Sequence, residues 1–294
     1  MCRAVDLHQS VLARNDESAH ALRARLTARG TTVVNLLSSP GSGKTALLEH
    51  ELTLARERSV PVAALTADLA TDNDAARLAR SGVPVRQILT DGLCHLEAGM
   101  LGRYLEGWLP RPTRLLFVEN VGNLVCPASY DLGETLRVVL ASVTEGEDKP
   151  LKYPTAFGLA HLVVVTKTDI AEAVDFDEAA FRAHVQQVNP GVEVLLTSVR
   201  RQVGLGTLLD RALSAAETGA PPHTPVMAAR PHDHADHAGH ARPGEHTGHT
   251  GHTDTADHTE HARPADHGDP AEHGGQAEHA HPAGHPHTPV SSRS

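Results

Sequence analysis

The chain has 294 residues and a formal net charge of −10, and its composition divides it into two unequal parts. Residues 218–294 hold 16 of the 22 histidines and no Leu, Ile or aromatic residue, so they lack the apolar side chains that a folded core requires. Neither part is basic, no run of 18 apolar residues exists and no secretory signal precedes the first helix, so we expect no nucleic-acid binding, no membrane span and a cytoplasmic protein.

The apolar spacing of residues 5–30 fits an amphipathic helix that ends at Gly30, so residues 1–30 are predicted to form an N-terminal helical segment. TTVVNLLS (31–38) then predicts a strand, followed by a glycine loop and a helix. Further apolar strands are predicted at 60–68, 83–89, 114–121, 161–169 and 192–198. Residues 31–217 should therefore form an α/β domain with helices on both faces of a mostly parallel sheet, and ligands belong at the carboxyl ends of its strands.

The stretch SSPGSGKT (38–45) matches the phosphate-loop pattern G-x-x-x-x-G-K-[ST], except that Ser38 replaces the first glycine. Its backbone N–H groups are expected to surround phosphates, while Lys44 contacts the β and γ phosphates and Thr45 ligates Mg²⁺. The predicted nucleotide-binding loop comprises Gly41, Ser42, Gly43, Lys44, Thr45 and Ala46. The alternative is a glycine-rich turn without a ligand, which the preceding strand and the following helix disfavour.

Acidic residues at predicted strand ends are candidates for the magnesium site. Asp68 ends the strand 60–68, and Asp72 follows in TDND, where a solvated helix cap is the alternative. Glu119 ends LLFVE, the usual place of a Walker B acid, and E-N-V-G resembles the D-x-x-G loop, so Gly122 is expected to sense the γ phosphate. The predicted catalytic set is Lys44, Thr45, Asp68 and Glu119, with Asp72 as a further magnesium ligand.

The bound base is predicted from VVVTKTD (163–169), which resembles the guanine motif N-K-x-D with Thr166 in place of Asn. Asp169 is expected to accept two hydrogen bonds from guanine, which adenine does not offer, and Lys167 to lie along the base. Ser198, in TSVRRQVGLG, is the predicted contact from the loop behind the base. GTP is favoured, and ATP remains the alternative.

Three cysteines, Cys2, Cys94 and Cys126, are too few for a disulfide framework and direct attention to metal chemistry. Cys94 and His95 are adjacent in DGLCHLEAGM, and Cys126 follows the loop that carries Glu119. Two thiolates and an imidazole form a soft ligand set that suits Ni²⁺ or Zn²⁺. Water or a second copy of the chain would complete the coordination, whereas the alternative is that each cysteine is a small buried apolar residue.

The C-terminal segment 218–294 is predicted to be a disordered, histidine-rich tail that binds metal weakly, because each binding event must order a flexible chain. Composition does not distinguish nickel from copper, zinc or cobalt, and a linker without function is the alternative. The first candidate ligands in the tail are His232, His234, His237 and His240.

Taken together, SSPGSGKT, TDND, DGLCHLEAGML, FVENVGNLVCP, SVTEGEDKPLKYP and VVVTKTD resemble the hydrogenase nickel-incorporation GTPases of the HypB family, over roughly residues 1–217. The resemblance implies the dimerising P-loop fold class that includes signal-recognition and nitrogenase-iron-type proteins, and it matches Cys94, His95 and Cys126 to a Ni/Zn site near a dimer interface. It also implies a GTP-dependent homodimer, a HypA-type nickel chaperone as partner, and nickel delivery to the [NiFe]-hydrogenase large subunit. The chain lacks the MC-x-x-C-x-C start of some members, since Cys2 stands alone.

The sequence therefore favours a slow GTPase in which hydrolysis gates the release of nickel. A urease-type nickel GTPase is one alternative, but the Cys-Pro-His arrangement expected of it does not occur. A metal-storage protein with a P-loop that does not switch is the other.

Overall fold

The computed structural model of the protein describes residues 2–68, 73–90 and 92–229. Its sheet has seven strands in the order β3-β2-β4-β1-β5-β6-β7, and every pair of neighbours is parallel. The strands are β1 (Thr32–Ser38), β2 (Val62–Asp68), β3 (Val85–Leu89), β4 (Leu115–Gly122), β5 (Leu136–Ser142), β6 (Leu162–Thr166) and β7 (Val194–Leu196). The predicted parallel α/β architecture is confirmed.

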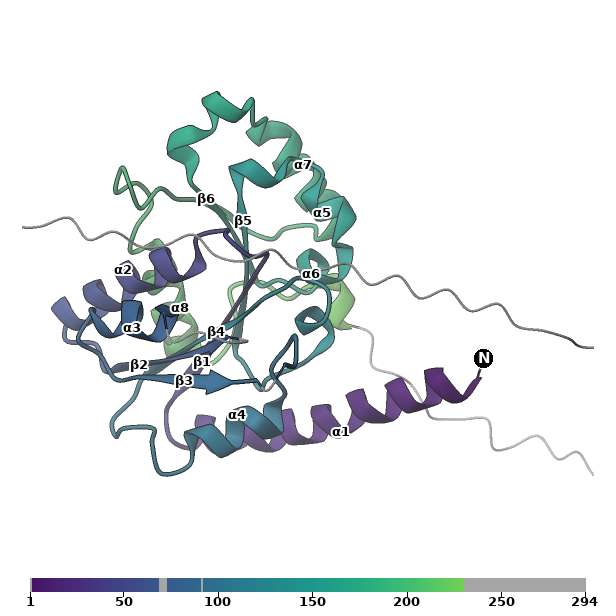
Figure 1. Ribbon diagram of the computed structural model, residues 1–294, viewed down its shortest axis with the longest axis vertical. Coiled ribbons are helices and arrows are strands. Elements are labelled where there is room, and N and C mark those ends of the chain that lie inside the picture. The colour runs from purple at the N-terminus through teal and green to yellow at the C-terminus, as the bar shows by residue number, and fades with distance from the viewer. Residues whose placement is uncertain (1, 69–72, 91, 230–294) are drawn as a thin grey trace, which may run out of the picture. The chain divides into compact units, whose positions relative to one another are not determined.

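Helices cover both faces of the sheet (Figure 1). The α-helices are α1 (Cys2–Thr27), α2 (Lys44–Glu57), α3 (Asn73–Ala79), α4 (Ala98–Leu105), α5 (Lys149–Lys152), α6 (Pro154–Gly158), α7 (Glu178–Val188) and α8 (Thr207–Thr218). Short 3-10 turns are η1 (Pro127–Ser129), η2 (Val143–Glu145), η3 (Thr168–Ile170), η4 (Glu172–Val174) and η5 (Val226–Ala229). No helix in the described ranges is both long and apolar enough to cross a membrane.

Side-chain alternation along β1 divides the core into two layers. Val34 and Leu36 pack with α2, α3 and α8, whereas Val33 and Leu37 face the opposite side. On that second side α1 and α4 cover one half of the sheet, and α6 and α7 cover the other. Central strands buried on both faces explain the uninterrupted apolar runs in the sequence.

The second half of helix α1 packs against the rest of the protein. Its buried positions Asn15, Ala19, Leu22 and Leu26 recur every three or four residues, which is the spacing of one helix face. Figure 1 shows α1 lying beside α4, with its N-terminal part projecting past the sheet. The helix ends at Thr27, three residues before Gly30.

Two details differ from the predicted strands. Strand β5 was not predicted, although its sequence LRVVLAS is buried throughout and shows the apolar, β-branched run typical of a central parallel strand. Strand β6 ends at Thr166, so Lys167 and Asp169 lie in the following loop and in η3 rather than in the strand. The loops that follow β1, β4 and β6 all leave the same edge of the parallel sheet, which is where a ligand is expected.

Candidate nucleotide and metal sites

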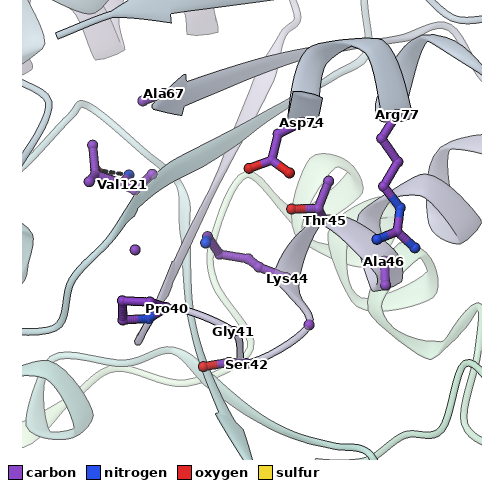
Figure 2. Close-up of a pocket in the computed structure, with 13 residues that line it drawn as sticks. Pro40, Gly41, Ser42, Lys44, Thr45, Ala46, Ala67, Asp74, Arg77 and Val121 are labelled. Carbon is purple, nitrogen blue, oxygen red and sulfur yellow. Dashed lines mark hydrogen bonds between the residues drawn. The ribbon is translucent and has the colours of Figure 1, made fainter. Parts of the chain in front are cut away.

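A cavity of 470 Å³ lies between the end of β1 and the ends of β2 and β4 (Figure 2). The loop from Pro40 to Gly43 forms one wall and leads into α2, whose first residue is Lys44. Gly41 and Gly43 have φ angles of +73° and +90°, a left-handed conformation that glycine adopts without strain. The other lining residues are Thr45, Ala46, Ala67, Asp74, Arg77, Asn120, Val121 and Gly122.

Glu119 is the buried acid of this site. Its side chain is 1% exposed, and its Oε1 accepts a hydrogen bond from the Thr45 hydroxyl at 2.6 Å and lies 3.5 Å from the Lys44 Nζ. Burial raises the pKa of Glu119, while Lys44 and Thr45 oppose that rise. Its Oε2 is buried and has no hydrogen-bond partner among the described residues, an arrangement that suits a cation or a water molecule.

The structure does not describe the side chains of the other two acids that were predicted to bind magnesium, Asp68 and Asp72. Asp68 is the last residue of β2, and its side chain lies outside the described part of the structure, as does the whole of Asp72. Asp74, in the first turn of α3, lines the cavity, and Figure 2 shows its carboxylate beside Thr45 and Lys44. The TDND stretch therefore supplies an acid to the cavity at Asp74, a residue that was not among the predicted magnesium ligands.

Buried side chains from β5 onward hold the phosphate loop from behind. The Ser42 hydroxyl lies 2.8 Å from both Glu145 Oε1 and the Ser39 carbonyl oxygen. Lys149, 7% exposed, forms an ion pair with Glu145 and donates to the Ser39 hydroxyl at 2.5 Å. Burial opposes ionisation of Glu145, but hydrogen bonds from Lys149, Ser142 and Ser42 outweigh it and lower the pKa of the carboxyl. The loop backbone is thus fixed without help from a ligand.

The residues predicted to bind the base are brought together at the end of β6. The Thr166 hydroxyl donates to the Ser42 carbonyl at 2.5 Å, and Lys167 Nζ donates to the Gly41 carbonyl at 2.8 Å. Asp169 accepts a hydrogen bond from the Ser198 hydroxyl at 2.6 Å, which lowers the pKa of Asp169. Thr166, at the position where Asn is usual, therefore ties the base loop to the phosphate loop.

The thiols of Cys94 and Cys126 meet although they come from separate loops. Cys94 precedes α4, and Cys126 is the residue before η1. Hydrogen bonding to Cys126 raises the pKa of the Cys94 thiol, and Cys94 Sγ lies 3.6 Å from His95 Nδ1. Both cysteines are half-buried, which is not the environment of apolar core fillers.

The imidazole of His95 packs on the ring of Tyr130, with 3.9 Å between the ring centres. Burial lowers the pKa of His95, so the ring is held in the neutral form that binds metals. Its Nε2 is buried, lacks a hydrogen-bond partner in the described ranges and lies 3.9 Å from a Glu97 oxygen. In the described part of the chain, no three His, Cys, Asp or Glu side chains are positioned as they stand to hold one ion, so the thiol pair and imidazole form an incomplete set.

Residues 32–196 match the family model described as CobW/HypB/UreG, nucleotide-binding domain. The hydrogenase maturation factor HypB of Azotobacter chroococcum mcd 1 is 48% identical over 207 residues, which cover 70% of this chain and 68% of that protein. The chain belongs to the HypB family. HypB of Escherichia coli strain K12 is 44% identical over 208 residues, or 71% of each protein. The crystal structure of HypB from Helicobacter pylori in complex with nickel is 38% identical, with a TM-score of 0.66 over 71% of this chain and 97% of that one.

In this member of the HypB family, the structure adds residues that motif reading did not assign. Asp74 lines the nucleotide cavity, Glu145 and Lys149 hold the phosphate loop, and Tyr130 orients His95. The stretch SVTEGEDKPLKYP had drawn attention only through its resemblance to the family, yet it contains the ion pair behind the loop. The tail candidates His232, His234, His237 and His240 lie outside the described residues.

Proposed function

We propose that this protein hydrolyses GTP to gate the delivery of nickel to the large subunit of a [NiFe]-hydrogenase. One observation carries the proposal: strand β4 places Glu119 against Lys44 and Thr45, and seven residues later the same segment places Cys126 against Cys94. A change at the γ phosphate therefore acts on a segment that also holds a metal ligand. Family membership and the nickel complex of the Helicobacter pylori relative support the same interpretation.

The chemistry of hydrolysis requires positioning and charge stabilisation more than acid–base groups. The amides of residues 41–46 and the Lys44 ammonium would stabilise the phosphates, and Asp169 with Ser198 would select guanine. Thr45, Glu119 and Asp74 would supply hard oxygen donors for Mg²⁺, with Asp68 and Asp72 as the further ligands expected from the sequence, and Gly122 would lie close to the γ phosphate. Bound Mg²⁺ would neutralise charge on the β and γ phosphate oxygens. Attack of water on the γ phosphorus then breaks its bond to the β-phosphate oxygen and yields GDP and phosphate.

Nickel is the cargo in this scheme, and zinc is a second ion that the same ligands would accept. Cys94, His95 and Cys126 provide three donors, and a second copy of the chain would complete the site in a GTP-dependent homodimer. We further propose a HypA-type nickel chaperone as partner, a cytoplasmic location, and the organisation inferred from the sequence: a helix in 1–30, a GTPase domain in 31–217 and a nickel-buffering tail in 218–294.

The test measures nickel release from the full chain to a chelator with GDP, with GTP and with a non-hydrolysable GTP analogue. The thiolate-to-nickel charge-transfer absorption excludes the histidine tail, which contains no cysteine, and a Cys2→Ser background restricts it to Cys94 and Cys126. We expect release to depend on hydrolysis. Equal release under all three conditions would remove the role of the nucleotide and favour a storage protein.

A parallel competition with ATP tests the base preference. GTP should displace a labelled guanine nucleotide at concentrations at which ATP does not, because adenine lacks the donors that Asp169 accepts. Equal displacement by ATP would contradict the assignment of GTP.

A further inference from the structure

Four buried polar side chains lie in a sheet that is otherwise lined with apolar residues. Asn35 on β1, Asn120 on β4, Glu134 just before β5 and Arg137 on β5 are 0, 1, 5 and 8% exposed. They lie on the face of the sheet that carries α1 and α7, between the two apolar clusters of that face. Val33 and Leu37 flank Asn35 on the same side of β1, and Val33 belongs to one cluster and Leu37 to the other. Buried charges and amides seldom add net stability, so their presence calls for another explanation.

One end of this group holds the metal loop. The Arg137 guanidinium donates to Glu134 Oε1 at 2.7 Å, to the Ala128 carbonyl at 2.8 Å and to the Tyr130 carbonyl at 3.0 Å. Glu134 Oε2 accepts from the Leu132 amide at 2.7 Å. Burial alone would raise the pKa of Glu134, but the Arg137 charge and backbone hydrogen bonds lower it to about 2. The pair therefore stays ionised at neutral pH.

These contacts fix the backbone between two elements of the metal site. Cys126 immediately precedes η1, and Arg137 binds carbonyl groups within and just after that turn. Tyr130, whose carbonyl Arg137 holds, also packs its ring on His95. A displacement of the guanidinium would thus change the position of Cys126 relative to His95.

The other end of the group reaches the nucleotide site. Asn35 Nδ2 lies 3.5 Å from Glu134 Oε1, and Asn120 Nδ2 lies 3.4 Å from Asn35 Oδ1. Asn120 directly follows Glu119, and the two side chains bond on opposite sides of β4. These two hydrogen bonds are the longest in the series of contacts that links Asn120 through Asn35 and Glu134 to Arg137. Small movements of β4 would therefore strengthen or break them.

The strand is irregular at this same point. Leu36 pairs with Glu119, yet Ser38 pairs with Gly122, so β4 contains one residue more than β1 between the two pairings. An extra residue disrupts the regular ladder, and such bulges occur next to active sites. The segment from Glu119 to Gly122 is therefore less constrained by the sheet than the strands beside it.

We propose that Asn35, Glu134 and Arg137 are positioning residues that couple the end of β4 to the geometry of the nickel site. The inference rests on the proposed function, because it concerns how the nucleotide state changes nickel binding. When contacts of Glu119 with the nucleotide shift β4, Asn120 shifts with it and alters its hydrogen bond to Asn35. The Glu134–Arg137 pair then moves the carbonyls of Ala128 and Tyr130.

The experiment measures the nickel dissociation constant of the full chain, by thiolate charge-transfer absorption against a chelator, with GDP and with a non-hydrolysable GTP analogue. In the unmodified protein the two constants should differ by about 5- to 150-fold, the usual range of coupling between two sites. Asn35→Leu keeps the side-chain volume and leaves the Glu134–Arg137 pair intact, and it should bring the ratio to within about twofold of one. Arg137→Lys should also lower the ratio, and the double variant should lower it no further.

Asn15→Ala is the matched control. Asn15 bridges the same two loops from α1, donating to the Asp131 carbonyl at 2.8 Å and accepting from the Ala98 amide at 2.9 Å. It should weaken nickel binding equally with both nucleotides and leave the ratio unchanged. A ratio of one in the unmodified protein would overturn the proposed function together with the coupling. A larger ratio that survives both Asn35→Leu and Arg137→Lys would overturn the coupling alone.

Discussion

The phosphate loop and the thiol pair lie at opposite ends of the segment from Glu119 to Cys126, but they are built differently. The loop is held by the side chains of Glu145, Lys149 and Thr166, all of which come from outside it. The thiols are half-buried on two loops. The hydrogen bond from the Asn123 side-chain amide to the Cys94 carbonyl, which joins these loops, is long at 3.5 Å. One site is rigid before its ligand binds, and the other leaves room for rearrangement.

This difference teaches how the two sites can have different roles within one domain. A preformed loop loses little conformational entropy on binding, so most of its interaction energy remains available for affinity and for stabilising transition-state charge. If Cys94, His95 and Cys126 hold nickel as proposed, a three-donor set on two loops would leave the coordination of the ion incomplete and would allow its transfer to a partner that offers more ligands. The following changes test that contrast, beginning with the largest expected effect.

Lys44→Ala should lower the rate of GTP hydrolysis by about 100- to 1,000-fold, the usual cost of removing one donor that stabilises transition-state charge. The measurement is phosphate release at saturating GTP. Lys152→Ala is the control, because Lys152 is exposed and pairs with Asp148, the residue before α5. Unchanged turnover in Lys44→Ala would show that the loop is only structural.

Cys126→Ser should weaken nickel binding more than the roughly 10- to 100-fold typical of outer-shell changes, because a thiolate ligand is lost. Thiolate charge-transfer absorption during a nickel titration of the full chain measures the effect. Cys2→Ser provides the matched thiol control. If Cys2→Ser abolishes the absorption and Cys126→Ser does not, the metal site lies elsewhere in the chain.

Thr166→Val should weaken GTP binding by about five- to tenfold, because a hydrogen bond worth about 1 kcal/mol is lost and the Ser42 carbonyl is left without this donor. Fluorescent-nucleotide titration gives the affinity. Thr53→Val is the control, since its hydroxyl bonds only the Glu49 carbonyl within α2. An equal loss in both variants would mean that the loop does not depend on Thr166.

The smallest effect concerns acid stability. Burial lowers the pKa of His161 to about 4, and its Nδ1 accepts a hydrogen bond from the Arg137 amide at 2.9 Å. Between about pH 6.5 and 4, His161 is therefore protonated in the unfolded chain but neutral in the folded one. The free energy of unfolding decreases as the pH falls through this range. At about pH 5.5 the loss relative to pH 7.5 should be about 1 kcal/mol.

His161→Gln keeps an acceptor and cannot take up a proton, so it should remove that share of the acid destabilisation. Urea unfolding of both proteins at the two pH values measures the difference. An identical loss in the variant would contradict a role for His161 and leave other groups, such as the carboxyl of Glu134, as the source of acid sensitivity.

The sequence was most informative where function requires a fixed local pattern. The phosphate loop, Glu119 and the TKTD stretch were predicted from residue type and position after a strand, and the structure places them at one edge of the sheet, where parallel strands bring their carboxyl ends. Cys94 and Cys126 were predicted as metal ligands from residue type, and the structure brings their thiols together. The functional roles of these residues stay predictions. The parallel α/β fold followed from the same alternation of apolar runs and helices. Strand β5 was not predicted, although its sequence LRVVLAS has the apolar, β-branched composition of a buried parallel strand.

Other parts depend on contacts between residues far apart in the chain. Glu145 reaches Ser42 across 103 positions, and Asn120 reaches Asn35 across 85, so no local spacing marks either pair. Asp74 is one of three aspartates within seven residues, and the packing of α3 rather than a local motif places it in the cavity wall. The positions of Glu145, Asn120 and Asp74 near these sites therefore became visible only in the folded structure.

Gly122 determines how closely the two sites are spaced. A β-carbon at this position would lie 3.2 Å from the α-carbon of Pro40, so the main chain at the end of β4 rests directly on the main chain of the phosphate loop. Because no side chain separates them, the end of β4 and the phosphate loop at Pro40 cannot move toward each other independently. An alanine at position 122 would force the end of β4 and Pro40 apart by a few tenths of an ångström. Under the proposed function, that substitution would loosen the link between hydrolysis and nickel release without removing any ligand.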